Sequence, residues 1–283
     1  GVTYITADGD LHAASLSANG ADSYLTVNTG GYAQSSTTDV TLTVTGGQGY
    51  DHVRVNAESG ASVTADLSVG EGGSYTYVNA RNGGAVTLDV TAGSGGDSVD
   101  AESGGALTAD LSLGDGSNYT YVTAYNGGDV ALTVDGGSGY DSVSAYTESG
   151  GSIDATLNLG NGEGYVELQA YDGGNVTADV TLGSGEQSVN LWTNSASVIR
   201  ATVAGGAGAD SVTVHGGGDT YNNEGNTLDV TGVETVNVSD TSSGVTYITA
   251  DGDLHAASLS ANGAESYLTV NTGGYAQSST TDV

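Results

Sequence analysis

The chain repeats its own first forty residues at its end. Gly1–Val40 returns as Gly244–Val283, with Asp22 replaced by Glu265 as the single change. Agreement of this length, 243 residues apart, is the mark of a tandem repeat. The sequence therefore predicts one large repeat over residues 1–243 and the start of the next over residues 244–283.

A shorter period lies inside the large one. Gly-x-Gly turns recur about every 23 residues, and glycine pairs such as Gly83-Gly84 lie about half a period away. The Gly-x-Gly turns begin at Gly47, Gly70, Gly93, Gly114, Gly137, Gly160, Gly183 and Gly206. Each period thus holds two turns and two connecting segments.

The connecting segments alternate between apolar and polar residues, which is the period of a β-strand. In Val63–Ser68, for example, Val, Ala and Leu alternate with Thr, Asp and Ser. The apolar columns hold Val, Leu, Ile and Ala, and the chain has no Phe, Met or Pro, as a narrow core with unbroken strand ladders requires. We therefore expect an all-β fold, a parallel β-solenoid of the β-helix or β-roll kind. Each coil should have about 23 residues and two strands, and about ten coils should fill residues 1–243 of one continuous solenoid.

Charge narrows the possible partners. The chain has 34 acidic residues against Arg54, Arg81 and Arg200, and a net charge of −31. Nucleic acids and anionic membranes both need basic patches, so neither is an expected partner. The absence of cysteine excludes disulfides and cysteine-based sites, and no apolar run is long enough to insert into a membrane.

Several Gly-x-Gly turns have a recognisable form, which Gly46–Val55 (GGQGYDHVRV), Gly136–Ala145 (GGSGYDSVSA) and Gly205–Val214 (GGAGADSVTV) show best. They resemble the GGxGxDxUx nonapeptide of secreted, calcium-binding RTX β-rolls. Thr227–Ser239 resembles segments of bacterial surface-layer proteins and large RTX-like adhesins. The resemblance implies secretion to the cell surface and bound Ca²⁺. The candidate ligands are Asp22, Asp51, Asp97, Asp141 and Asp210, with Glu71 and Asp115 from intervening turns. The alternative is that these aspartates only cap their turns.

Two outward columns carry further hypotheses. Asp66, Asp89 and Asp110 fall at one position of consecutive coils, where stacked carboxylates require a cation or a saline habitat. Tyrosines form a stripe in alternate coils, which either stiffens the sheet or mediates lateral association or sugar stacking. The stripe contains Tyr75, Tyr77, Tyr119, Tyr121 and Tyr165.

The sequence favours a structural protein. Its acids follow the repeat, whereas a catalytic site is singular, so we expect no enzyme; an ice-binding face would need more regular threonines. We expect a secreted fibre, matrix filament or surface layer that associates with itself, with polysaccharide or the cell surface as a further contact. The alternative is the stalk of a calcium-dependent adhesin. Where the repeats meet, Thr227–Val230 and Val233–Val238 should pair with the coil before them and with Val245–Ala250, and Val236 and Val238 should point inward.

Overall fold

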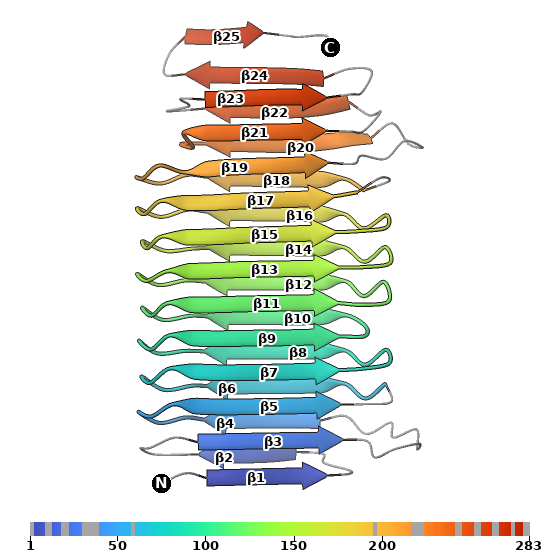
Figure 1. Cartoon of the computed structure of the whole chain (residues 1–283), viewed down its shortest axis with the longest axis vertical. Helices are drawn as coiled ribbons and strands as arrows, with labels where there is room; N and C mark the ends of the chain where they lie inside the picture. The colour runs from blue at the N-terminus through green and yellow to red at the C-terminus, as the bar shows by residue number, and fades with distance from the viewer. Residues whose placement is uncertain are drawn as a thin grey trace. The chain divides into compact units, whose positions relative to one another are not determined.

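The structure is a computed structural model that describes most of the chain. It describes the backbone of residues 3–8, 13–17, 23–29, 40–57, 60–194, 197–216, 224–240, 245–251, 256–261, 266–272 and 275–279. Side chains are described for residues 41–57, 60–194, 197–216 and 227–237. Asp22 lies outside these residues. Within the described backbone there is no helix, and all regular elements are β-strands (Figure 1).

The chain divides into two compact units, Gly1–Ser142 and Val143–Val283, and the boundary falls within β13 (Asp141–Thr147). The first unit contains β1 (Thr3–Asp8), β2 (Ala13–Ser17), β3 (Ser23–Thr29), β4 (Val40–Thr45), β5 (Asp51–Ala57), β6 (Val63–Ser68), β7 (Ser74–Ala80), β8 (Val86–Thr91), β9 (Asp97–Ser103), β10 (Leu107–Ser112), β11 (Asn118–Ala124) and β12 (Val130–Asp135).

The second unit continues the same alternation of longer and shorter strands. It contains β14 (Ile153–Asn158), β15 (Gly164–Ala170), β16 (Val176–Thr181), β17 (Gln187–Thr193), β18 (Ile199–Ala204), β19 (Ser211–Gly216), β20 (Glu224–Thr231), β21 (Thr235–Asp240), β22 (Val245–Asp251), β23 (Ala256–Ala261), β24 (Ser266–Thr272) and β25 (Tyr275–Ser279).

Within each unit, every strand pairs with the strand two places along the chain, so odd strands form one layer and even strands the other (Figure 1). The pairing is parallel and in register, as in the series Asp51, Ser74 and Asp97. The exception is β25, which is antiparallel to β24. The predicted parallel β-solenoid, with two strands per coil and roughly 23 residues per turn, is confirmed.

The core lies between the two layers and is built from the predicted apolar columns. On β6 and β8 alternate residues are buried and exposed, and Val63, Ala65 and Leu67 are almost fully buried. Burial of such apolar surface stabilises the fold by about 25 cal/mol per Å². On odd strands the outward residues are mostly half-buried, because longer side chains there cover one another.

The two edges of a coil use different turn chemistry. At the Gly-x-Gly edge successive coils touch, and a methyl group on Gly70 would overlap the carbonyl oxygen of Gly47. At the other edge, the pair Asn82 and Gly83 has positive φ angles of 59° and 88°, the conformation of a tight turn that glycine and asparagine tolerate best. Close stacking therefore requires glycine at the first edge, and chain reversal requires it at the second.

The junction of the repeats is paired within the second unit. Thr227–Val230 of β20 pairs with β18 and with β22, as expected. β21 pairs with β19 and β23, however, and not with Val245–Ala250, because that segment lies in the sheet of even strands. Val236 is buried as predicted. The side chain of Val238 lies outside the described residues.

The forty-residue segment occupies different sheets in its two copies. In the first unit Thr3–Asp8 pairs with β3, whose other neighbour is β5, a strand that follows a Gly-x-Gly turn. In the second unit the matching residues, β22, pair with β20, whose other neighbour is β18, a strand that precedes such a turn. The matching strands are β1 and β22, so 21 strands, an odd number, lie between one copy and the next in the part of the chain that the structure describes.

Candidate functional site

A column of polar side chains runs along the Gly-x-Gly edge inside each unit, and we call it the turn ladder. Its members are the first residues of the odd strands from β5 to β17, together with the residue before β19. In the first unit they are Asp51, Ser74, Asp97, Asn118 and Asp141, all at most 3% exposed. In the second unit they are Gly164, Gln187 and Asp210. Because the strands are in register, one position of every coil faces the interior of its turn.

The amide members show what this interior demands. The side-chain nitrogen of Asn118 donates to the carbonyl oxygens of Gly114 and Gly116, at 3.1 and 3.2 Å. It also donates to Oδ1 of Asp141 at 2.8 Å, while Oδ1 of Asn118 accepts the backbone N–H of Asp97 at 3.0 Å. The interior of the turn is therefore lined by carbonyl oxygens that need a donor or a cation.

Gln187 satisfies the same need in the second unit. Its Nε2 donates to the carbonyl oxygens of Gly162 at 2.6 Å and Gly160 at 3.3 Å. Its Oε1 accepts the backbone N–H of Gly183 at 2.8 Å. Although glutamine is one methylene longer than asparagine, its amide again contacts two glycine carbonyl oxygens.

The carboxylate members differ in how well they are satisfied. Asp210 accepts the N–H of Gln187 at 3.0 Å and that of Gly206 at 3.1 Å, so it acts as a turn cap. Asp51 accepts the N–H of Gly70 at 3.3 Å. Asp97 is 1% exposed and neither of its carboxylate oxygens has a partner in hydrogen-bond geometry. The hydroxyl and backbone N–H of Ser74 lie close enough to lower its pKa but do not complete a hydrogen bond. Turn-capping therefore accounts for Asp210 but leaves Asp97 unexplained.

Burial shifts the titration of these acids. It raises the pKa of Asp97 to about 6, although the side chain and backbone N–H of Ser74 lower this pKa, and the Asp51 charge adds a smaller upward shift. It also raises the pKa of Asp141 to about 6, against opposing contacts from Asn118 and the backbone of Gly137. The pKa of Asp210 is raised by burial as well, although the N–H groups of Gly206 and Gln187 lower it. Ionised, these carboxylates oppose folding.

The ladder fits a hard cation only in part. Carboxylate and carbonyl oxygens are the ligands that Ca²⁺ prefers, and Asp97 supplies two unpartnered ones. Among the described residues, however, no three His, Asp or Glu side chains are grouped closely enough to hold a metal ion. Glu71 and Asp115 are exposed, and they accept the hydroxyls of Ser94 and Ser138 from the following coils. A cation in the turn ladder would have few carboxylate ligands, and glycine carbonyl oxygens would have to supply the rest.

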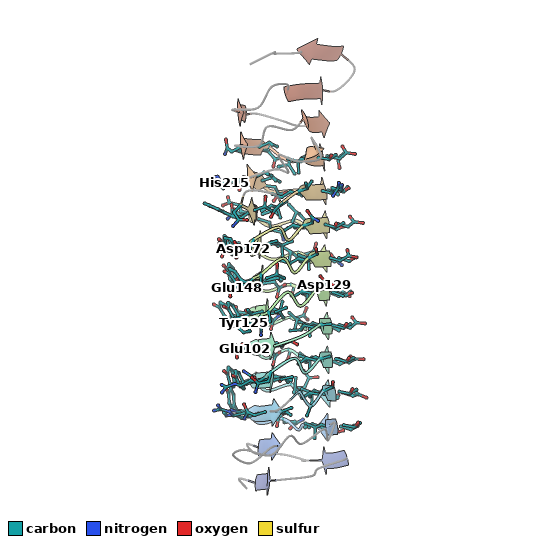
Figure 2. All side chains as sticks on the ribbon, turned by 90° about the vertical axis from the view of Figure 1, so that its right-hand side faces the viewer. Glu102, Tyr125, Asp129, Glu148, Asp172 and His215 are labelled. Carbon is teal, nitrogen blue, oxygen red and sulfur yellow. The ribbon has the colours of Figure 1, made fainter. Side chains whose placement is uncertain are left out.

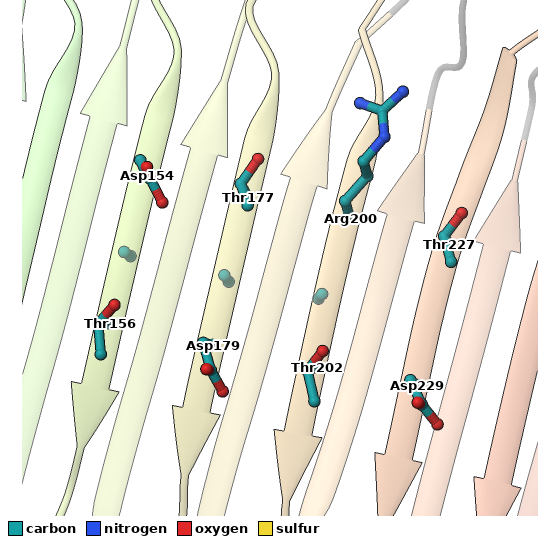
Figure 3. A pocket seen from close by; sticks show the side chains of 11 residues that line it. Asp154, Thr156, Thr177, Asp179, Arg200, Thr202, Thr227 and Asp229 are labelled. Carbon is teal, nitrogen blue, oxygen red and sulfur yellow. The ribbon is translucent and has the colours of Figure 1, made fainter.

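The outer face of the even strands carries short side chains, many of them acidic. Asp66, Asp89 and Asp110 are exposed and in direct register, as predicted. Burial, followed by the charges of Asp110 and Asp66, raises the pKa of Asp89. In the second unit this face holds a depression of about 400 Å³ on β14, β16, β18 and β20, where Arg200 rises among threonines and aspartates (Figure 3).

The outer face of the odd strands in the first unit carries the tyrosines. His52 meets the edge of Tyr75 with ring centroids 5.1 Å apart, and the Arg54 guanidinium lies 5.0 Å from the centroid of Tyr77. Glu102 accepts the Tyr77 hydroxyl at 3.1 Å and is also contacted by the Asn79 amide. Glu102 and Tyr125 lie on the same outer side (Figure 2). Tyr77 is therefore part of a polar network, and Tyr75 is held by a ring contact with His52.

The outer face of the odd strands in the second unit carries a similar row of polar and aromatic side chains. Glu167 accepts the hydroxyl of Tyr146 at 2.7 Å and the amide of Gln169 at 2.6 Å. Trp192 stacks on His215 with ring centroids 3.9 Å apart and is 39% exposed. These contacts fix the outward side chains of the odd strands in the second unit.

Sequence reasoning placed Asp51, Asp97, Asp141 and Asp210 in one column, and the structure does bring them to one edge in their respective units. It gave no role to Asn118 and Gln187, although both occupy the same position of the period. That shared position was the available signal. Comparison of the chain with protein-family models, curated proteins and solved structures finds no significant match. In the described residues no helix is long and apolar enough to cross a membrane.

Proposed function

We propose that this chain is part of a secreted structural protein, an extracellular fibre, matrix filament or surface layer built from tandem solenoid repeats. The supporting observation is the junction of the repeats. The second copy of the forty-residue segment continues the ladders of the coils before it, through β20 with β22 and β21 with β23. A new repeat is thus added without a break in backbone pairing, which is how a solenoid gains length.

Mechanical stiffness follows from this continuity. Each coil hydrogen-bonds to its neighbours along the axis, and no coil buries its apolar face alone. The 21 strands described from β1 to β21 make ten and a half coils, which at ~4.8 Å per coil should rise ~50 Å. Electron microscopy of a chain with several repeats tests this. Filaments that lengthen by about 50 Å per repeat, as the strand spacing requires, support the proposal, and compact particles of constant length contradict it.

We further propose that Ca²⁺ stabilises the fold at the turn ladder. The supporting observation is Asp97, a buried carboxylate whose two oxygens lack a partner in hydrogen-bond geometry. At the same position one coil later, the Asn118 amide contacts two glycine carbonyl oxygens. A ligand that binds only the folded state raises stability by mass action. Thermal unfolding followed by circular dichroism should therefore shift upward in millimolar Ca²⁺, and less in Mg²⁺, which demands a tighter octahedral site. An identical transition in EDTA and in Ca²⁺ would contradict this part of the proposal.

The alternative is the stalk of a calcium-dependent bacterial adhesin, whose ligand-binding domain would lie elsewhere in the protein. The same stiff solenoid suits both roles. Sequence beyond the repeats separates them, because an adhesin needs a terminal domain of different composition. Self-association, a cell-surface location and contact with polysaccharide remain parts of the proposal, which sedimentation of the purified chain and binding to isolated cell walls would test.

A further inference from the structure

Asp100 lies on the outer face of the first unit between two pairs of tyrosines. Its strand, β9, pairs with β7 on one side and β11 on the other. In register with Asp100 are Tyr77 on β7 and Tyr121 on β11, while Tyr75 and Tyr119 flank the neighbouring Ser98. The coil that carries the carboxylate is thus bordered on both sides by coils that carry aromatic rings.

The carboxylate of Asp100 is incompletely satisfied. Its Oδ1 is buried and has no hydrogen-bond partner, although the residue stands on an outer face. Glu102, two residues along the same strand, is held by the Tyr77 hydroxyl and the Asn79 amide. Burial raises the pKa of Asp100 to about 6, and the charge of Glu102 adds to the effect. Two acidic groups are therefore held together on one strand.

The chain itself shows what a cation does beside these rings. Arg54 occupies the same column one coil before Tyr77, and its guanidinium lies 5.0 Å from the ring centroid. Asp100 stands in register between Tyr77 and Tyr121, one strand spacing (~4.8 Å) from each strand. In the same column, Arg54 shows that a cation one coil from Tyr77 reaches its ring, within the ~6 Å range of a cation–π interaction. A cation at Asp100 would occupy the equivalent position on the other side of Tyr77, with Tyr121 as a second aromatic neighbour and two carboxylates beside it.

We propose that Asp100, with Glu102 and the flanking Tyr77 and Tyr121, forms a binding site for an alkylammonium group supplied by another molecule. The chain has no lysine, so a lysine ammonium cannot come from a second copy of it. Aromatic rings beside carboxylates favour an organic cation, because a hard metal ion prefers a shell of oxygen ligands. The natural sources are a lysine side chain of a partner protein or an amino sugar.

The experiment is a titration of the full chain, with ¹³C-labelled tyrosine rings, followed by NMR. The probes are n-butylammonium, tetramethylammonium, an Nα-acetyl-lysine amide and glucosamine, at constant ionic strength. We expect a saturable shift of a subset of tyrosine signals. Asp100→Asn should weaken binding at least about tenfold, whereas Asp89→Asn, an exposed carboxylate without aromatic neighbours, should not change it. Tighter binding of the Nα-acetyl-lysine amide would point to a lysine of a partner protein, and tighter binding of glucosamine would point to an amino sugar.

A matched pair of variants tests the aromatic part. Tyr121→Phe keeps the ring and should bind like the original chain, while Tyr121→Leu should bind about two- to fivefold more weakly, the size of one exposed cation–π contact. Equal weakening by Asp100→Asn and Asp89→Asn would show only diffuse attraction to a chain of net charge −31 and would overturn the proposal. So would displacement of the ammonium probes by equimolar Ca²⁺.

Discussion

The substitution Asp97→Asn should stabilise the protein in the absence of divalent cations. Asp97 is buried, neither carboxylate oxygen is partnered, and its pKa is raised from 3.8 to about 6. At pH 7.5 the buried charge therefore costs about 3 kcal/mol, because each pKa unit corresponds to ~1.4 kcal/mol. An asparagine removes the charge and adds a donor for the glycine carbonyls, as Asn118 does at the same position one coil later.

The assay is thermal or urea unfolding followed by circular dichroism at pH 7.5 with EDTA. The variant should unfold with a free energy larger by about 2–3 kcal/mol, or about 4–10 °C higher for a domain of this size. If Ca²⁺ binds at Asp97, the original chain should become more stable than the variant in millimolar Ca²⁺, because Ca²⁺ stabilises the original chain and not the variant. The control is Asp210→Asn, which also removes a buried charge but replaces one of the two carboxylate oxygens that accept N–H groups by an NH₂ group, so its gain should be clearly smaller than that of Asp97→Asn or absent. A variant destabilised by more than about 1 kcal/mol in EDTA would refute the idea that the ladder needs a donor at this position.

Three further predictions test the ladder, the turns and the topology. Asp97, Asp100 and Asp141 have folded-state pKa values raised to about 6. The stability that their protonated forms contribute is therefore complete below pH 3.8 and is lost as the pH rises through 6. In EDTA the transition temperature should fall between about pH 5 and 7.5, and it should fall less steeply in the double variant Asp97→Asn/Asp141→Asn. Gly70→Ala should destabilise by about 3 kcal/mol or more, because its methyl would overlap the Gly47 carbonyl oxygen. Gly83→Asn has open space, and asparagine tolerates a positive φ best after glycine, so its cost at φ 88° should be clearly smaller; equal costs in urea unfolding would contradict this account of the edges. Cysteines at Asp229 and Thr249, paired on neighbouring strands, should form a disulfide on oxidation, and cysteines at Asn237 and Thr249 should not; the opposite result on a non-reducing gel would place β22 in the other sheet.

Much of the fold was predictable because a solenoid repeats each local rule in every coil. Alternating Val63, Ala65 and Leu67 identify a strand and its buried face, and the repeated Gly-x-Gly identifies the edge where coils touch. The sheet assignment of Val245–Ala250 was not predictable from the same patterns. It depends on whether the number of strands in the large repeat is odd or even. In the sequence, the 23-residue spacing is interrupted near residues 32–38 and 217–223, so the period alone does not give that count.

The candidate site was predictable in position and less so in chemistry. The period placed Asp97 and Asn118 in one column, but burial and hydrogen bonds decide what each does there. Asp210 and Asp97 are the same residue type at the same position, yet Asp210 receives two N–H bonds and Asp97 none. The difference comes from the neighbouring coil. For Asp210 that neighbour supplies the backbone N–H of Gln187, whereas the N–H of Ser74, beside Asp97, donates to the carbonyl of Gly96.

The alternation of charged and neutral residues in the first unit's ladder has an electrostatic reason. Two carboxylates on adjacent coils, ~4.8 Å apart at an effective dielectric constant of about 20, would repel by ~3.5 kcal/mol, and at twice that distance by half as much. Ser74 separates Asp51 from Asp97, and Asn118 separates Asp97 from Asp141. On the outer face, Asp66, Asp89 and Asp110 are adjacent without such spacers, because in water the same pairs repel by less than about 1 kcal/mol. The two acidic columns therefore follow different rules: the exposed one tolerates a charge on every coil, and the buried one carries a charge on alternate coils, with Asn118 bonding to both neighbouring aspartates.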